Sequence, residues 1–225
     1  MKSVFDKYHE RYDAWYDRNR FVYLSELNVL KKVLPKKGRG LEIGVGTGRF
    51  AAPLGIQYGI DPSEKMIETA KKRGIRVQPG RGENLPFKDA AFDYAAIIIT
   101  ICFVKNPRKV LKEAYRVLKK KGEIILGIVD KDSFLGKFYQ YKKSVFYKQA
   151  KFFSVAELTV LLKSAGFNNI SYYQTLYNLP DEITSVQRPK KSFGEGGFVV
   201  IKACKEARGK IESPDKKKQN TYFRN

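Results

Sequence analysis

The sequence has few of the residues that build disulfide frameworks and metal sites. Its 225 residues include two cysteines, Cys102 and Cys204, and a single histidine. Cysteines about a hundred residues apart are too few and too scattered for a disulfide framework or a zinc site. We therefore expect no bound metal and a reducing compartment, the cytoplasm.

Long apolar runs are also missing. The longest, residues 95–104, is interrupted by Thr100 and is much shorter than the roughly 20 residues that a membrane-spanning helix needs. Charges interrupt every apolar pair in residues 1–15, a pattern that predicts neither a signal peptide nor a spanning helix. We expect no membrane partner, and the 95–104 run suits a strand buried on both faces.

Acidic residues are scarce beside basic ones. The chain has 23 Asp and Glu against 44 Lys and Arg, a formal charge of +21. Such an excess favours nucleic-acid binding when the basic residues cluster, but the clusters here are small and lie mostly at expected helix ends, where cations complement the helix dipole. Nucleic acid therefore stays an alternative partner. The abundance of Lys, Tyr and Ile is compatible with a thermophilic source.

Segments with helical periodicity alternate with short apolar runs, which predicts an α/β fold with a mostly parallel sheet. The expected strands are residues 40–43, 57–60, 75–78, 92–99, 123–129, 170–175 and 198–203. The expected helices are residues 4–19, 21–34, 63–74, 107–118 and 154–166, with a short one inside 49–55. The length suits one domain, residues 1–204, with a helical cap (1–35), an aromatic-rich insert (130–153) over the active site and a flexible basic tail (205–225).

The most informative stretch is the segment 41–49, Leu-Glu-Ile-Gly-Val-Gly-Thr-Gly-Arg. Three alternating glycines directly after a strand let the backbone turn sharply and approach a ligand where a Cβ would collide. A dinucleotide fingerprint has its third glycine at the sixth position, where Arg49 stands, which argues against NAD and FAD. A phosphate-binding P-loop is excluded because no Gly-Lys-Ser/Thr follows.

Asp61 ends the second expected strand, seventeen residues after Gly44. In a parallel sheet the strand ends meet at one edge, so its carboxylate is expected beside the glycine loop, where it can accept both hydroxyls of a ribose. The alternative is a turn acid that only caps the chain before Pro62.

These residues, together with the block 82–87 (Gly-Glu-Asn-Leu-Pro-Phe) and Phe92-Asp93, resemble the class I S-adenosylmethionine-dependent methyltransferases, specifically the small single-domain group with a Leu-Pro-Phe block. The resemblance covers about residues 36–130. It implies a doubly wound, mostly parallel seven-stranded sheet with an antiparallel last strand, the Rossmann-like methyltransferase fold. It also implies S-adenosylmethionine as cofactor and S-adenosylhomocysteine as product.

The resemblance further implies a set of cofactor-binding residues. They are Glu42, Gly44, Val45, Gly46, Gly48, Asp61, Pro62, Met66, Gly82, Glu83, Asn84 and Thr100. The glycines would wrap the methionine part with Glu42 near its amino group, Asp61 would hold the ribose, and Met66 would pack near the adenine. The chain departs from many relatives at Arg81, where an acid is usual, so backbone groups near Gly82 are expected to contact the adenine. Glu83 has an equally good alternative role, bonding backbone amides to hold its loop.

Methyl transfer requires alignment and exclusion of water more than a fixed catalytic residue, so none is predicted. The acceptor should lie above the carboxyl ends of the strands, with candidate contacts from Tyr12, Trp15, Tyr16, Cys102, Phe103 and Asp130. An aromatic wall suits a cationic amine, although a stripe at helical spacing can equally be packing. The leading hypothesis is methyl transfer to nitrogen, oxygen or carbon of a small molecule, a small amine among them. The alternatives are tRNA methylation and a non-catalytic cofactor-binding module.

Overall fold

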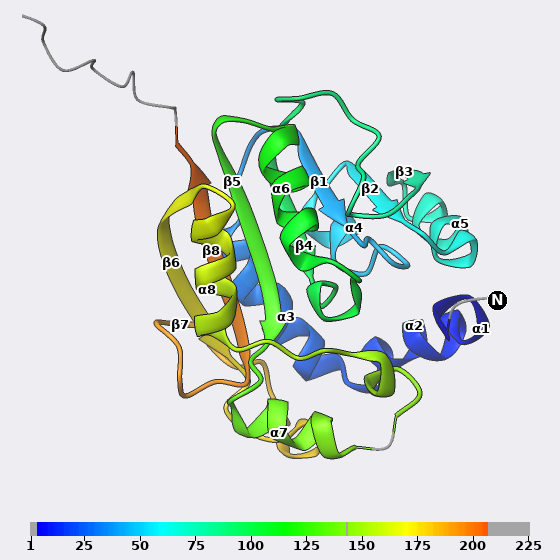
Figure 1. The fold of residues 1–225 in the computed structure, drawn as a ribbon. Coiled ribbons are helices and arrows are strands. Elements are labelled where there is room, and N and C mark those ends of the chain that lie inside the picture. Colours follow the sequence, from blue (N-terminus) through cyan, green and yellow to red (C-terminus); the bar gives the residue numbers. More distant parts are fainter. Residues whose placement is uncertain (1–3, 143, 207–225) are drawn as a thin grey trace, which may run out of the picture.

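The strands of the predicted α/β pattern join in one sheet with helices on both faces (Figure 1). The computed structural model describes residues 4–142 and 144–206. Its strands are β1 (Gly40–Ile43), β2 (Tyr58–Asp61), β3 (Arg76–Pro79), β4 (Phe92–Ile98), β5 (Leu118–Val129), β6 (Phe167–Thr175), β7 (Lys190–Lys191) and β8 (Phe198–Lys205). Their spatial order is β3-β2-β1-β4-β5-β8-β6-β7.

This topology confirms the predicted Rossmann-like methyltransferase fold. Strands β1 to β5 pair in parallel, whereas β8 runs antiparallel between β5 and β6. The described residues add an eighth strand, β7, to the seven that were expected. Its two lysines are exposed and pair with Tyr173 and Gln174 at the sheet edge, so no apolar run in the sequence marks it.

Helices cover both faces of the sheet. The helices of the described residues are α1 (Val4–Lys7), α2 (His9–Arg18), α3 (Arg20–Val33), α4 (Ala51–Leu54), α5 (Glu64–Lys72), α6 (Pro107–Val117), α7 (Phe134–Tyr141) and α8 (Val155–Ser164), with short 3₁₀ turns η1 (Ile101–Phe103), η2 (Tyr147–Gln149) and η3 (Pro180–Glu182). The expected capping box at the start of α8 is present, because Ser154 and Glu157 each accept from the other's backbone N–H.

Alternation along the central strand β4 divides the core into two layers. Ala95 and Ile97 face the layer under α6 and α8, whereas Ala96 and Ile98 face the layer under α3, as the two-residue period of a strand requires. All four side chains are buried. The sheet is therefore a rigid platform, and the loops at the carboxyl ends of its parallel strands are held in fixed positions.

Several element boundaries differ from the predictions, and three of the differences bear on the packing. The helix expected over residues 4–19 is interrupted at Tyr8, whose backbone leaves the helical region (φ −123°, ψ 27°); the aromatic stripe survives because the rings of Phe5 and Tyr12 still meet at 5.8 Å. Strand β5 begins at Leu118, which pairs with Phe92 across a bulge.

Lys205, which was expected to begin the tail, instead ends β8. Its Nζ donates to the Tyr115 and Leu118 carbonyls at 2.6 and 2.7 Å. Residues 207–225 of that tail lie outside the described residues.

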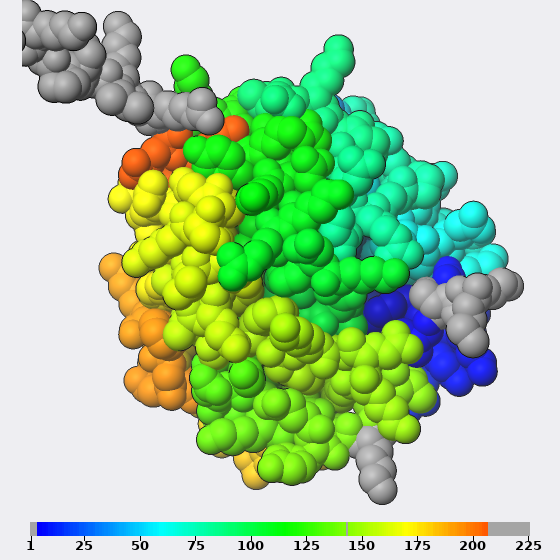
Figure 2. Space-filling view, in the orientation of Figure 1, coloured from blue at the N-terminus to red at the C-terminus, as the bar shows by residue number. Residues whose placement is uncertain are grey.

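The helices α1 and α2 lie across the carboxyl ends of β1 and β2, beside α5 (Figure 1). Asp13 accepts two hydrogen bonds from Arg73, both 2.8 Å, and two from Arg49, at 2.9 and 2.7 Å. Arg49 also pairs with Asp17 at 2.6 Å. We call Asp13, Asp17, Arg49 and Arg73 the N-terminal clasp, because it binds α2 both to the loop after β1 and to the end of α5. Figure 2 shows the N-terminal segment between the surfaces of α5 and the insert.

The clasp is partly buried, so we predict a measurable contribution to stability. Burial alone raises the pKa of Asp13, but hydrogen bonds from Arg73 and Arg49 outweigh it and hold the pKa well below its usual range. Arg73→Met should lower the free energy of unfolding by about 1–2 kcal/mol at pH 7. The difference should shrink below about pH 4, because a depressed carboxylate pKa contributes stability only while the carboxylate stays ionised.

Chemical denaturation of both proteins at pH 3, 5 and 7 measures this difference. Lys65→Met is the matched control, since Lys65 lies on the same helix α5 and its ion pair with Glu68 is half exposed on both sides. An exposed pair of this kind contributes little to stability. Equal stability losses in the two variants would show that the clasp is no stronger than a surface pair.

Candidate active site

The loop after β1 depends on its glycines. Gly44, Gly46 and Gly48 have φ of 76°, 53° and 81°, in the left-handed region that side chains disfavour. The N–H groups of Gly44 and Val45 both donate to the Ile60 carbonyl at the end of β2, at 2.8 and 3.0 Å. A Cβ on Gly44 would lie 2.1 Å from Thr100 Cγ2. The loop therefore lies against both neighbouring strands, β2 and β4.

Thr100 and Asp61 fasten the loop from either side. Thr100 Oγ1 contacts the carbonyls of Gly44 and Ile98 at 3.1 and 3.0 Å. Asp61 Oδ2 accepts from the Gly46 N–H and Oδ1 from the Ser63 N–H, both at 2.9 Å. Burial raises the pKa of Asp61 to about 6, against the opposing effect of these N–H donors. The carboxylate is therefore turned toward the glycine loop, and its hydrogen bond from Ser63 also gives it the turn role that was the alternative. Its contact with a ribose stays a prediction.

Glu42 is a buried acid at the same loop. Its side chain is 1% exposed, and its Oε2 has no hydrogen-bond partner within the described part of the chain. Burial and the nearby Asp61 raise its pKa well above the usual range, although the Ala51 N–H donates to it. A buried carboxylate oxygen without a partner is costly unless a ligand supplies a cation or a donor.

At Gly46 an added Cβ would meet only the edge of the Tyr12 ring, at 3.8 Å, so the backbone there is open to a ligand. The loop fits the amino-acid end of S-adenosylmethionine.

The third loop, residues 80–87, is anchored to α6. Glu83 Oε1 accepts from the backbone N–H groups of Lys105 and Asn106, at 3.0 and 3.2 Å. This is the loop-holding role foreseen as the alternative for Glu83. Gly82 packs so closely that a Cβ would lie 2.8 Å from Ile43. Asn84 is exposed beside it, and across the site Met66 is 1% exposed on α5. Adenine contacts by these residues stay a prediction.

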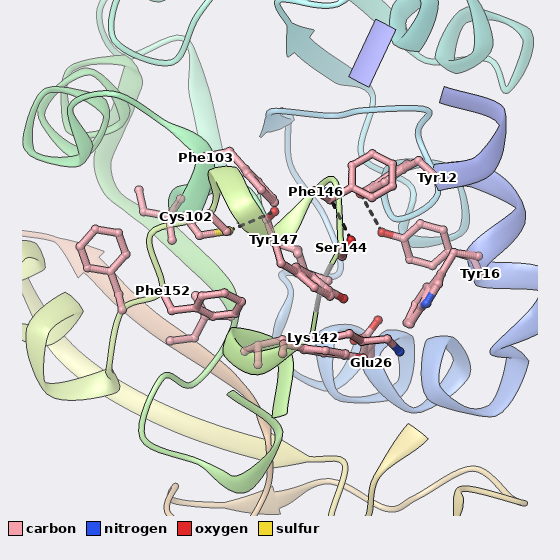
Figure 3. A pocket seen from close by; sticks show the side chains of 18 of the residues that line it. Tyr12, Tyr16, Glu26, Cys102, Phe103, Lys142, Ser144, Phe146, Tyr147 and Phe152 are labelled. Carbon is pink, nitrogen blue, oxygen red and sulfur yellow. Dashed lines mark hydrogen bonds between the residues drawn. The ribbon is translucent and has the colours of Figure 1, made fainter. Parts of the chain in front are cut away.

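A cavity of about 260 Å³ lies beyond the glycine loop, between α2, α3, η1 and the insert (Figure 3). Five residues predicted for the acceptor line it, namely Tyr12, Trp15, Tyr16, Cys102 and Phe103. Sequence reasoning missed further lining residues, among them Glu26, Tyr139, Phe146, Tyr147, Phe152 and Phe153. Most of these come from the 130–153 insert, whose place over this region was predicted without its individual contacts.

The pair Tyr12 and Tyr16 joins the loop to the cavity. Their hydroxyl oxygens are 2.8 Å apart, and Tyr12 is also the ring nearest to Gly46. Burial raises the pKa of both phenols, so both are neutral hydrogen-bonding groups at physiological pH. Burial likewise raises the pKa of the Cys102 thiol to about 12, which makes Cys102 an apolar wall residue.

The structure places Asp130 apart from the other residues predicted for the acceptor. Among the described residues that line the cavity, Asp130 is missing. Its Oδ1 instead accepts from the Val155 and Asp132 N–H groups at 3.3 and 3.4 Å. The chain turns into α7 directly after β5, which places this carboxylate at the start of α8, where helix N–H groups attract a negative charge.

Glu26 is the main residue that sequence reasoning missed. It lies on α3 and is 2% exposed, and its Oε2 has no partner among the residues that the structure describes. Its carboxyl group points into the cavity, toward Tyr147 and Tyr16 (Figure 3). Val22, Glu26 and Leu30 follow one another at intervals of four residues, so all three lie on the buried face of α3. An acid at this spacing was the signal that could have identified Glu26.

The chain resembles known methyltransferases along most of its length. A methyltransferase domain family matches residues 41–126. An uncharacterized protein of Methanocaldococcus jannaschii is 52% identical over 205 residues, covering 90% of this chain and 99% of that protein. The crystal structure of an S-adenosylmethionine-dependent methyltransferase from Thermotoga maritima, named as a possible histamine N-methyltransferase, has a TM-score of 0.88 and 51% identity, covering 90% of this chain and 98% of that one.

A more distant relative is the ubiquinone/menaquinone biosynthesis C-methyltransferase of Rickettsia bellii, 29% identical over 213 residues, or 76% of this chain and 86% of that protein. With the fold and the glycine loop, these likenesses show that the chain belongs to the class I S-adenosylmethionine-dependent methyltransferases. It is an enzyme that uses S-adenosylmethionine, which sets the non-catalytic alternative aside. Within the described residues, no helix is long and apolar enough to cross a membrane.

The buried Glu26 predicts a specific pH dependence. Burial raises its pKa to about 8, whereas an exposed Glu in the unfolded chain has a pKa near 4.3. The folded protein therefore retains this proton over a range in which the unfolded chain has lost it. Stability should fall as the pH rises through this range and level off above it. Glu26→Leu removes the group, so its stability advantage over wild type should grow by a few kcal/mol between pH 5 and 8.

Denaturant unfolding at pH 5, 6, 7, 8 and 9 checks this expectation. Glu10→Leu on α2 is the control, because the Glu10 side chain is 92% exposed and its removal should not change the pH profile. A Glu26→Leu profile parallel to that of wild type would mean that Glu26 ionises normally.

Proposed function

We propose that the chain transfers the methyl group of S-adenosylmethionine to a small-molecule acceptor bound in the cavity between α2, α3 and the insert. The observation that carries the proposal is the cavity itself: it is small, about 260 Å³, lined largely by aromatic rings, and reached from the glycine loop through Tyr12. Cavities of this size and lining suit small ligands. An acceptor there would approach the cofactor from the side opposite the sheet.

We also propose the residues that hold the cofactor. The backbone of Gly44, Val45, Gly46 and Gly48 would take its methionine part, Glu42 its amino group and Asp61 its ribose. Support comes from the unpartnered Glu42 Oε2 and from the Asp61 carboxylate beside Gly46. The segment from Pro62 to Met66, the loop with Gly82, Glu83 and Asn84, and Thr100 would complete the site. Bound here, S-adenosylmethionine supplies an electrophilic methyl group on its sulfonium.

The chain's own contribution is positioning and exclusion of water. The N-terminal clasp holds α2 over the glycine loop, so Tyr12 and Tyr16 stay fixed between the two ligands. Orientation of two reactants can by itself supply up to roughly 7–11 kcal/mol in ideal cases. The buried rings keep water from the reacting atoms. No general base is assigned, since one is needed only for an acceptor that still carries its proton.

The wider setting is part of the proposal. Residues 1–204 would form one methyltransferase domain, with residues 1–35 as a cap and residues 130–153 as the insert over the acceptor. Both cysteines are free thiols, in keeping with a reducing cytoplasmic compartment. The composition rich in Lys, Tyr and Ile supports a thermophilic origin.

Cofactor binding is tested by calorimetric titration of S-adenosylhomocysteine. We expect saturable binding to wild type and at least a tenfold loss in Asp61→Ala, because a charged acceptor of two ribose hydroxyls is removed. Affinity should also fall below about pH 6 as Asp61 takes up a proton. The control is Asp181→Ala, an exposed acid on η3. Equal affinity in wild type and Asp61→Ala would contradict the assigned role of Asp61.

The acceptor class is tested with labelled S-adenosylmethionine. We expect label in a pool of small amines, phenols and enolisable ketones and none in total tRNA, with the same enzyme and buffer in both reactions. Transfer to tRNA would favour the alternative that the formal charge of +21 keeps open. Heat-treated enzyme controls for label transferred without catalysis.

A further inference from the structure

The cavity has an acidic floor and a basic rim. Glu26 lies at the buried end, 2% exposed. The cations that line the cavity, Arg11, Arg18 and Lys142, are all exposed residues. Lys142 Nζ lies 5.1 Å from the centre of the Phe138 ring. No cation in the described part of the chain comes within ion-pair distance of Glu26. Among the residues that the structure describes, the acid is thus left without a cation as partner.

Aromatic side chains from several elements line the same cavity as this acid. The titratable groups electrostatically coupled to Glu26 are Tyr12 and Tyr16 on α2, Tyr23 on α3, Tyr139 on α7 and Tyr147 on η2. The rings of Tyr139 and Tyr147 lie 4.6 Å apart, and those of Trp15 and Tyr16 lie 5.2 Å apart. Burial raises the pKa of every one of these tyrosines. Electron-rich ring faces around a carboxylate make an environment that attracts a cation.

A structural role does not account for Glu26. An acid that holds a fold together accepts hydrogen bonds, as Glu83 does from Lys105 and Asn106. Glu26 Oε2 is buried and accepts none within the described residues, so the carboxyl group costs stability where an apolar side chain would not. A ligand that brings its own donor would remove this cost at the moment of binding.

We propose that the methyl acceptor carries a basic amine, which Glu26 binds as a protonated nitrogen at the floor of the cavity, within the cage of Trp15, Tyr16, Tyr139 and Tyr147. The proposal rests on the proposed function, because it takes this cavity as the acceptor site. The rest of the acceptor lies against Cys102, Phe103 and Phe152 and must be mainly apolar. Glu26 is thus the residue that determines specificity: an amine brings the cation that favours its carboxylate form, whereas a neutral molecule or a carboxylate brings none.

Binding by this arrangement has a distinct signature, the release of a proton. At pH 7 burial keeps the free Glu26 mostly protonated, since its pKa is about 8. An arriving ammonium ion favours the carboxylate, so the carboxyl proton passes to the buffer. The tyrosines that face Glu26 stay neutral at this pH because their pKa values are raised. We expect about one proton released for each amine bound.

The test uses full-length protein saturated with S-adenosylhomocysteine and two matched pairs of probes. They are 2-phenylethylamine with 2-phenylethanol, and hexylamine with hexanol. Calorimetry at pH 7 in phosphate and in Tris, which differ in ionisation enthalpy, gives both affinity and proton release. We expect wild type to bind at least one amine tenfold or more tightly than its alcohol. Glu26→Gln should remove this preference and the proton release together, and should leave alcohol binding unchanged.

Two controls make the outcomes separable. Glu10→Gln makes the same substitution at an exposed position of α2 and should behave as wild type. The affinity for S-adenosylhomocysteine, measured first, reports the proposed function and the folding of each variant. If S-adenosylhomocysteine fails to bind wild type, the proposed function fails. If S-adenosylhomocysteine binds but neither amine binds more tightly than its matched alcohol, only the amine proposal is overturned. The same holds if phenylacetate, an anionic probe of similar size, binds more tightly than 2-phenylethylamine and 2-phenylethanol. If Glu26→Gln fails to fold, the affinities of the amines and their alcohols for wild type decide the amine proposal by themselves.

Discussion

The constraint on which the site depends is a set of carboxyl groups buried at the carboxyl ends of the sheet, with no cation of the described residues paired to them. Glu42, Asp61 and Glu26 are each less than a tenth exposed, and burial raises the pKa of all three. The chain has 44 basic residues, yet none of those described forms an ion pair with these acids. Such groups lower the stability of the empty protein, which is expected where ligands supply the missing donors and cations.

The N-terminal segment connects the two halves of the site. Its acids Asp13 and Asp17 bind Arg49 and Arg73, so the segment is fastened to the glycine loop and to α5. Its aromatic residues Tyr12 and Tyr16 then lie between the glycine loop and the cavity. One short segment therefore forms a wall of the proposed cofactor site and a wall of the proposed acceptor cavity. A change in how it packs would affect both ligands together.

Much of the fold could be predicted because its signals are local. The capping box of Ser154 and Glu157, the apolar run of β4 and the glycines after β1 are each contained within a few residues. The topology followed from the family resemblance. Strand β7 could not be predicted, since two exposed lysines carry no strand pattern. The break at Tyr8 was also missed, because the aromatic spacing continues across it.

The sequence by itself determined the class of enzyme and the cofactor, because the glycine loop, Asp61 and the Leu-Pro-Phe block are short motifs whose meaning depends on spacing along the chain. Only the tertiary structure decided which side chains line the proposed acceptor cavity. Glu26 and Tyr147 are 121 positions apart in the chain, and α3 and the insert come together only when the sheet brings its carboxyl ends to one edge. The role proposed for Glu26 depends on side chains that are distant in the sequence, and only the folded chain brings them to one cavity.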